Sequence, residues 1–211
     1  MIRIKQFNFN PYKENTYVLS DQTGECVIID PGCYEGAEQN ELVAYIAEEE
    51  LNPVLLLNTH CHIDHVFGNK FVFDQYGLLP VCHELELDVL HAVPSYAPAM
   101  GMEYELSPEP RQFIEEFDEI SFGETSMMVI FNPGHSPGSV SFYSKADKLL
   151  VSGDALFFES IGRTDLPGGS LETLTRNIRE KLFKLDPATR VFPGHGRDTT
   201  IAHEMEFNPF L

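Results

Sequence analysis

The chain has 211 residues, of which 43% are hydrophobic, and this suffices for one substantial core in a single domain spanning residues 1–211. Its formal net charge of −19, from 33 acidic and 14 basic side chains, disfavours nucleic-acid binding because a polyanion would be repelled over most of the surface. No apolar stretch suits a membrane span or a signal peptide, so we expect a cytoplasmic protein that contacts no membrane.

Apolar runs and alternating patterns predict ten strands. Five are expected near residues 2–9, 16–20, 25–30, 54–58 and 79–82, and five more near 119–122, 127–132, 139–144, 148–152 and 190–193. Helices are expected between them, because Leu42 and Ile46 share an apolar face that ends before Pro53, and Ser170 can cap another amphipathic segment. Three further helices are expected near 65–76, 84–91 and 199–206. This pattern predicts two sheet layers covered by helices on the outside.

Four metal-capable side chains lie within six residues, directly after an apolar run at 54–57. They are His60, His62, Asp64 and His65. On an extended segment the imidazoles at i and i+2 point to the same side, whereas a helix that begins at Asp64 would direct Asp64 and His65 toward a second position. One loop can therefore supply ligands to two adjacent metal ions.

Three more candidate ligands follow predicted strands, on exit loops where binding groups are usually mounted. His135 and His195 each follow a Pro-Gly pair that allows a sharp turn, and Asp154 ends the buried-strand pattern that begins at Leu149. As a carboxylate between the two histidines in the sequence, Asp154 is the natural bridge between two cations.

The order His-x-His-x-Asp-His, Pro-Gly-His, Ser-Gly-Asp and Pro-Gly-His resembles the metallo-β-lactamase superfamily. Asp30-Pro31-Gly32 is similar to the early strand and turn of that superfamily, and residues 161–169 and 199–211 resemble its short type II glyoxalase-like (hydroxyacylglutathione hydrolase-like) members. The resemblance implies an α+β fold: a four-layer αβ/βα sandwich of two mixed sheets with helices on the outer faces. The ligand loops of both halves would meet at one edge.

The same resemblance implies the ligand set. Metal one would be held by His60, His62 and His135, and metal two by Asp64, His65 and His195, with Asp154 bridging. The lactamases that name the superfamily usually carry Cys at the position of Asp154, which argues against antibiotic hydrolysis. Imidazole and carboxylate ligands suit zinc, iron and manganese alike, so we expect two divalent ions, with zinc as the first candidate.

The expected chemistry is thioester hydrolysis, with Asp64 and Asp154 as the catalytic residues. Two divalent ions would lower the pKa of a water, and the resulting bridging hydroxide would attack a carbonyl carbon. A thiolate can leave without a general acid, whereas an amide nitrogen cannot, and the sequence offers no obvious acid beyond the ligands. The acyl group and the thiol carrier stay open, since long type II glyoxalases carry a C-terminal glutathione-binding region with no counterpart here.

Two segments are candidates for contact with a small-molecule substrate. Arg163 lies in a glycine-rich loop shortly after Asp154 and could bind a carboxylate, although it could instead pair with Asp165. Residues 92–111 contain four prolines with aromatic and methionine side chains, so we expect a loop that forms either a lid or a flap over the core.

Other classes of function remain open. Persulfide dioxygenases resemble the chain in the His and Asp positions and in the Gly-Arg-Thr-Asp loop, but they use a single iron. Lactonases and other hydrolases of the superfamily are further alternatives, as is a noncatalytic metal-stabilised binding module. The four cysteines show no disulfide or metal spacing, and His83, His91 and His203 are expected to be packed or surface residues. The oligomeric state is not predicted.

Overall fold

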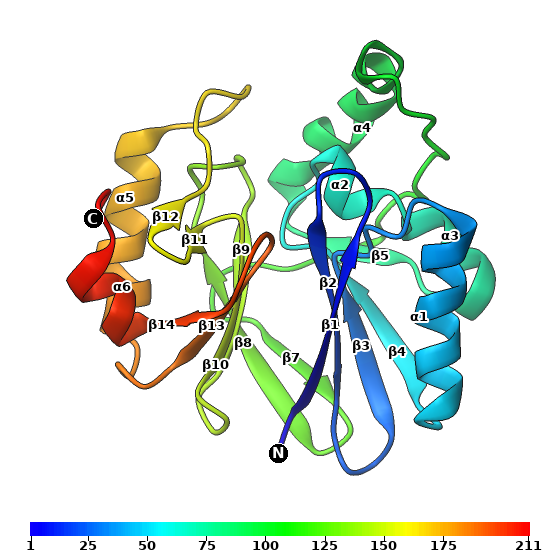
Figure 1. Cartoon of the computed structure of the whole chain (residues 1–211), viewed down its shortest axis with the longest axis horizontal. Coiled ribbons are helices and arrows are strands. Elements are labelled where there is room, and N and C mark those ends of the chain that lie inside the picture. The colour runs from blue at the N-terminus through cyan, green and yellow to red at the C-terminus, as the bar shows by residue number, and fades with distance from the viewer.

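A computed structural model describes residues 1–211 and contains two six-stranded sheets that face each other (Figure 1). The first sheet contains β1 (Arg3–Phe9), β2 (Glu14–Ser20), β3 (Glu25–Ile29), β4 (Asn52–Leu57), β5 (Pro80–Cys82) and β6 (Gln112–Phe113), in that order. Its first three strands are antiparallel, and β3 to β6 run parallel. The sheet is therefore mixed.

The second sheet is also mixed, because β13 runs parallel to β10 while the other pairs are antiparallel. In spatial order it contains β14 (Thr199–Thr200), β13 (Arg190–Pro193), β10 (Leu149–Gly153), β9 (Val140–Ser144), β8 (Thr125–Phe131) and β7 (Glu119–Phe122). A short ribbon of β11 (Leu156–Phe157) and β12 (Ser160–Ile161) follows β10. All ten predicted strands are present, within a few residues of their expected ends.

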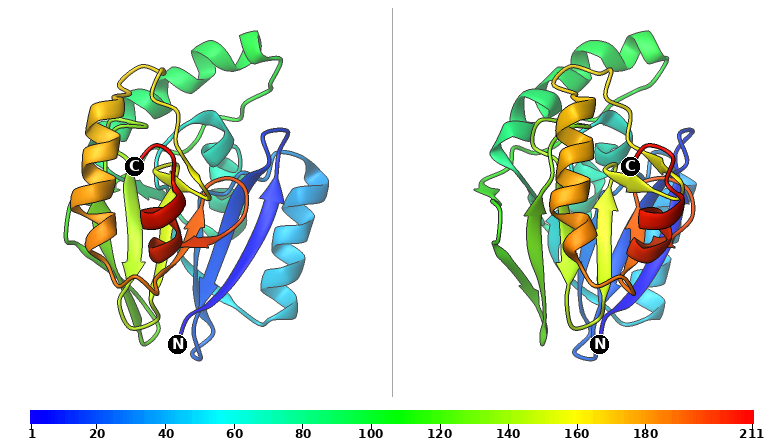
Figure 2. Two further views of the ribbon diagram at one scale, coloured as in Figure 1. Left: turned by 60° about the vertical axis from the view of Figure 1, so that its left-hand side comes forward. Right: turned by 90° about the vertical axis from the view of Figure 1, so that its left-hand side faces the viewer.

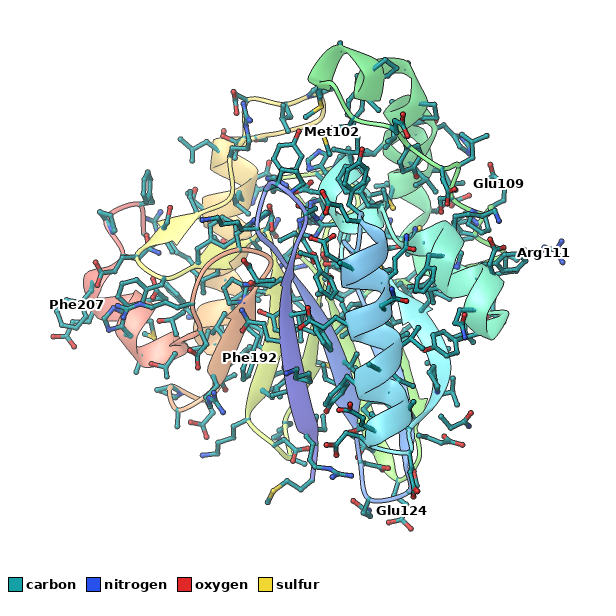
Figure 3. All side chains as sticks on the ribbon, turned by 45° about the vertical axis from the view of Figure 1, so that its right-hand side comes forward. Met102, Glu109, Arg111, Glu124, Phe192 and Phe207 are labelled. Carbon is teal, nitrogen blue, oxygen red and sulfur yellow. The ribbon has the colours of Figure 1, made fainter.

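Alternation along the strands places apolar side chains on both faces of each sheet. In β3, Val27 and Ile29 pack in the cluster between the two sheets, while Cys26 and Ile28 pack in the cluster on the outer face. Phe192 of β13 belongs to the inner cluster and lies toward the middle of the molecule (Figure 3). This period-2 pattern is what a sheet buried on both faces requires.

Helices cover the outer face of each sheet, with α1 and α3 beside the first and α5 and α6 beside the second (Figure 1). Their bounds are α1 (Gly36–Glu48), α3 (Asn69–Tyr76), α5 (Leu171–Glu180) and α6 (Ile201–Phe207). Ser170 caps α5 as predicted, because its side chain accepts a hydrogen bond from the Thr173 amide at 3.2 Å. The four-layer sandwich expected from the sequence is confirmed.

The helix expected over 65–76 is in fact two helices, α2 (Ile63–Val66) and α3. The Gly68 amide donates to the Pro31 carbonyl at 2.7 Å, so it is not available to the helical ladder at that point. A Cβ atom at residue 68 would lie 2.5 Å from Cys33 Sγ, so the close approach requires glycine. The break separates the ligand-bearing helix α2 from the structural helix α3.

The prediction of a loop over residues 92–111 is wrong for residues 92–96, which are helical. After the short 3₁₀ helix Glu84–Glu86, helix α4 (Leu87–Tyr96) continues through Pro94 and is followed by a second 3₁₀ turn, Ala97–Met100. Burial of Leu90 and Val93 compensates for the hydrogen bond that proline cannot donate. Figure 2 shows α4 rising above the same end of the sheets as the loop that precedes α5.

The rest of this segment lies on a core cluster. Met102 and Tyr104 pack with Phe67 and Cys61, behind the ligand-bearing helix α2. Met102 lies at one end of the molecule and Arg111 at its flank (Figure 3). Of the two expected roles, these contacts favour the flap that covers the core.

All four cysteines are buried, and none is paired in a disulfide. None of the helices combines the length and the apolar character that a bilayer-spanning helix requires.

Asp21 joins the two sheets at the end opposite to the ligand loops. Its Oδ2 accepts hydrogen bonds from the Glu124 amide at 2.7 Å and the Thr125 hydroxyl at 3.2 Å, and its Oδ1 accepts from the Thr23 amide at 2.9 Å. Gly123 has a φ of +54°, and a Cβ there would lie 2.4 Å from Asp21 Oδ1. The β7–β8 turn can therefore reach Asp21 only with glycine at this position.

Replacing Asp21 with asparagine is expected to lower the free energy of unfolding near neutral pH. Burial alone would raise the pKa of Asp21, but the hydrogen bonds that it accepts lower it to about 2. A carboxyl with a depressed pKa in the folded state stabilises the fold above about pH 4, and this contribution disappears as pH falls toward about 2. Urea titrations across that pH range should show the difference in free energy of unfolding between wild type and Asp21→Asn decreasing as the pH falls. A difference that does not change with pH would contradict this prediction. An equal effect of the control Glu119→Gln, at an exposed strand position, would also contradict it.

Candidate metal centre

The first group of ligands comes from both halves of the molecule. His60 and His62 follow β4 of the first sheet, and His135 follows β8 of the second. The Nε2 atom of His135 lies 2.9 Å from His62 Nδ1 and 3.2 Å from His60 Nε2. The His62 backbone is extended, and its ring centroid lies 4.8 Å from that of His60, so both rings face one side as predicted. The ligand nitrogens of all three residues lie within 4.8 Å of one another.

The second group contains Asp64, His65 and His195. Helix α2 begins directly after His62, and its first turn carries Asp64 and His65. The centroid of the His65 ring lies 4.1 Å from that of the His60 ring, so the two groups are adjacent. His195 Nε2 lies 3.1 Å from Asp64 Oδ2, and His65 Nε2 lies 3.8 Å from the same oxygen. The ligand atoms of these three residues also lie within 4.8 Å of one another. The loop at 60–62 and the first turn of α2 thus supply predicted ligands to two adjacent metal positions.

Asp154 lies between the two groups. Its Oδ2 is 3.5 Å from His135 Nε2 of the first group and 3.6 Å from His195 Nε2 of the second, and its Oδ1 is 3.4 Å from His65 Nε2. A Cβ atom at residue 194 would lie 2.1 Å from Asp154 Oδ1, so Gly194 makes this approach possible. The structure brings all seven predicted ligands together, with Asp154 between the two groups.

The cluster fits two divalent cations. His65 Nε2 and Asp154 Oδ1 are buried at its centre and have no hydrogen-bond partner, although buried polar atoms in native proteins are nearly always satisfied. Several imidazole nitrogens also converge at short range without a shared acceptor, which is costly unless a cation receives their lone pairs. Imidazole nitrogen and carboxylate oxygen are ligands that zinc, iron and manganese all accept.

Contacts behind the ligands fix the orientation of four imidazole rings. The Nδ1 atom of each meets an oxygen on the side away from the cluster: Thr59 Oγ1 for His60 (3.1 Å), Asp30 Oδ2 for His65 (3.1 Å), the Arg163 carbonyl for His135 (2.7 Å) and the Tyr12 carbonyl for His195 (3.2 Å). A carbonyl or carboxylate acceptor requires a proton on Nδ1, which leaves the lone pair on Nε2. For His65, His135 and His195 these contacts therefore orient Nε2 toward the cluster.

Asp30 is a buried carboxylate that the sequence analysis noted only as part of a turn. It accepts hydrogen bonds from the Thr59 amide at 2.7 Å and the Thr59 hydroxyl at 2.5 Å, besides its contact with His65. Glu14, also fully buried, lies 4.0 Å from His65 Nδ1. Both carboxylates lie behind His65 and not on the open side of the site. The available signal for Asp30 was a buried-strand pattern ending in a carboxylate, the same signal that identified Asp154.

Burial and charge affect the predicted ligands in two ways. Burial alone would lower the pKa of His65 and His195, but the carboxylates of Asp154 and Asp64 raise it, so these two rings hold a proton that a cation would displace. Burial and neighbouring imidazoles lower the pKa of His62 to about 4 and that of His60 well below its ordinary value, so both rings are neutral near pH 7. Burial alone would raise the pKa of Asp154, but the adjacent imidazoles of His65 and His135 hold it below its usual range. Neutral imidazole and ionised carboxylate are the forms that coordinate metals.

Glu86, which the sequence analysis did not single out, joins the ligand loops of the two halves. Its Oε2 accepts from the Cys61 amide at 2.7 Å, between His60 and His62. Its Oε1 accepts from the Ser136 hydroxyl at 2.5 Å and the Gly138 amide at 2.7 Å, in the loop of His135. The side chain is fully buried, and burial raises its pKa. In the sequence, Glu86 looks like one of many acidic residues on a solvated helix.

The remaining sequence candidates lie outside the cluster. Arg163 contributes only its carbonyl to the site, while its guanidinium forms two 2.8 Å hydrogen bonds to Asp165. His83 stacks on Phe131, and the other two histidines form surface pairs, His91 with Glu109 and His203 with Glu159. None of these three histidines contacts a ligand.

Comparisons with known proteins agree with this geometry. Residues 10–195 match the family described as the metallo-beta-lactamase superfamily. The probable metallo-hydrolase YqgX of Bacillus subtilis is 38% identical, and the hydroxyacylglutathione hydrolase GloC of Haemophilus influenzae is 33% identical. Each alignment covers 95% of this chain and 93% of the relative.

Two solved structures extend the similarity to the fold. BLEG-1, described as a B3 metallo-β-lactamase, has a TM-score of 0.91 at 36% identity, covering 99% of both chains. TTHA1623, solved in a di-iron-bound form, has a TM-score of 0.88 at 36% identity, covering 98% of this chain and 100% of that one. The similarity thus runs through nearly the whole chain, and one similar protein holds two iron ions.

Proposed function

Since the chain belongs to the metallo-β-lactamase superfamily and is a metallo-hydrolase, we propose that it hydrolyses a thioester, with a hydroxyacyl thiol such as hydroxyacylglutathione as the substrate class. The observation that carries the proposal is the cluster of seven ligands around two adjacent positions, with Asp154 between them. The similarity to a hydroxyacylglutathione hydrolase supports the substrate class.

Two bound divalent ions would supply a water of lowered pKa and a polarised carbonyl. The chain's own residues determine where that chemistry occurs. His60 and His135 are buried, whereas His62, Asp64 and His195 are partly exposed and leave one side of the cluster open. A substrate can therefore reach the cluster from that side, while the opposite side is closed by protein.

The surroundings of the cluster favour a good leaving group. The carboxylates nearest to the ligands, Asp30 and Glu14, both lie on the Nδ1 side of His65, which faces the protein interior. Neither is placed to protonate a leaving atom on the open side. A thiolate needs no such proton, whereas the nitrogen of an amide does, and general acid catalysis contributes roughly 10²–10⁴-fold. This arrangement supports thioesters as the preferred substrate class.

A substrate panel with metals quantified in the same samples tests the proposal. We expect thiol release from thioesters with two metal ions per chain, at rates at least about 100-fold above those for a β-lactam or an unstrained amide, because the latter lack the required acid. Lactones should be hydrolysed at rates between those for thioesters and amides. One iron per chain with oxygen uptake would identify a dioxygenase instead, and faster turnover of the β-lactam would replace thioester hydrolysis with lactam hydrolysis.

A further inference from the structure

A cleft of about 570 Å³ opens beside the ligand His195, and we call it the His195 cleft. One wall is the β1–β2 hairpin, including Tyr12, Lys13 and Asn15, and the other is the loop after β13, including Arg197. Small-molecule sites typically measure about 300–1,000 Å³. Of the seven predicted ligands, His195 alone lines this cleft, so a molecule bound at the metal centre could extend into it past the His195 ring.

The His195 cleft carries positive charge in a strongly acidic protein. Lys13 and Arg197 are exposed, and neither has a carboxylate or hydrogen-bond partner in the protein. Asp198, the one carboxylate in the lining, pairs with Arg190 at 2.9 Å. With a formal net charge of −19 over the whole chain, two cations without a carboxylate partner beside His195 make a local attraction for anions.

The walls of the cleft are held in place. The Asn15 side-chain nitrogen Nδ2 donates to the Pro193 carbonyl at 2.9 Å and the Gly196 carbonyl at 2.8 Å, on either side of His195. The Arg197 guanidinium lies 3.4 Å from the ring centroid of Phe158, and this stacking leaves its N–H edge free to bind.

The hairpin holds Lys13 in a backbone conformation that non-glycine residues rarely adopt, with a φ of 56°. Its amide donates to the Asn10 carbonyl at 3.0 Å, and its carbonyl accepts from the Asn8 side chain at 2.8 Å. The Lys13 backbone is therefore fixed at the mouth of the cleft.

We propose that the His195 cleft binds the thiol part of the substrate through carboxylate or phosphate groups, with Lys13 and Arg197 as the contacts. The inference rests on the proposed thioester hydrolysis, because the cleft adjoins the predicted ligand His195 and is larger than a hydroxyacyl group needs. Arg163 would have to leave Asp165 to make a similar contact, whereas Lys13 and Arg197 are free. The thiol is therefore an anionic carrier, and the acyl group is the small end of the substrate.

Kinetics with matched thioesters test the cleft. The lactoyl thioesters of glutathione (carboxylates), coenzyme A (phosphates) and N-acetylcysteamine (neutral) share one acyl group and differ in the charge of the thiol. The test variant is Lys13→Asn with Arg197→Gln, in which asparagine suits the positive φ and glutamine keeps much of the stacking area. Lys145→Asn with Arg179→Gln removes the same charges from exposed positions outside the cleft.

For the test variant, kcat/KM should fall about tenfold or more for at least one anionic thioester, mainly through KM, and less than about twofold for the neutral one. The thioester with the larger loss identifies carboxylate or phosphate as the bound group. The control variant should match wild type. Equal losses for anionic and neutral thioesters, or no loss for either anionic one, would overturn the proposal.

Binding measured without turnover separates this proposal from the proposed function. S-methylglutathione and S-methyl coenzyme A cannot be hydrolysed as thioesters, and calorimetry gives their dissociation constants. If metal-loaded wild type hydrolyses no thioester, thioester hydrolysis fails. The cleft still stands if one of these probes binds wild type about tenfold or more tightly than the test variant. Equal binding to both proteins, or none to either, rejects it.

Discussion

Replacing Asp154 with alanine is expected to lower kcat by at least about 1,000-fold, equivalent to about 4 kcal/mol of transition-state stabilisation. The reason is its position, since one carboxylate oxygen lies within 3.6 Å of ligand nitrogens from both groups. Metal content measured after dialysis should fall from two ions per chain, and the increase in melting temperature on adding metal should shrink accordingly.

Two further variants separate the charge of Asp154 from its shape. Asp154→Asn keeps the size of the side chain but removes its charge, so it should resemble alanine in metal content. Asp186→Asn, at an exposed carboxylate that pairs with Lys148, changes the charge equally and should leave both activity and metal content unchanged. If Asp154→Ala retains full activity with two metals bound, Asp154 is not a bridge.

The ligands could be predicted because each carries a local signal. A metal-binding residue must be of a particular type, and it usually sits where a strand ends, so composition and apolar pattern together identify it. His60, His62, Asp64 and His65 combine both signals in six residues. His135, Asp154 and His195 were recognised because their short motifs occur in the expected order.

The residues that hold the ligands in place lack such signals. Asp30 and Glu86 act through distant partners, Thr59 and His65 for the first and both ligand loops for the second, so nothing next to them in sequence reveals the role. Gly194 seemed to be a turn former, but its missing side chain also makes room for Asp154. These roles depend on contacts between segments far apart in the chain.

The fold shows the same division between local and distant causes. Strands such as β3 and β4 are long enough for apolar patterns to reveal them. β6, β11, β12 and β14 have two residues each and exist because a neighbouring strand pairs with them. The extension of α4 through Pro94 likewise depends on tertiary packing, since proline alone would predict an end to the helix.

Glu86 should be the residue outside the ligand set whose loss affects the metal centre most. In Glu86→Ala, the Cys61 amide, the Gly138 amide and the Ser136 hydroxyl lose a shared acceptor in a buried place. Each unsatisfied buried group costs about 1–3 kcal/mol, so a loss of about 3 kcal/mol or more is expected. For a chain of this size the melting temperature should fall by about 10 °C.

The variant Glu86→Gln distinguishes positioning of the ligands from general stability. Its single amide oxygen can accept from Ser136 and Gly138, but its NH₂ group then faces the Cys61 amide, a donor opposite a donor. The loop that carries His60 and His62 should shift, and metal affinity should fall about 10–100-fold while the fold is retained.

Competition with a chelator gives the metal affinity of this variant, and the visible spectrum of the cobalt-substituted protein reports the ligand geometry directly. Glu84→Gln, at an exposed neighbour in the same 3₁₀ helix, should behave like wild type in both measurements. If Glu86→Gln also keeps wild-type affinity and spectrum, the carboxylate stabilises the fold without orienting the ligands. Asp154 would then be the residue that connects the ligand loops of the two halves.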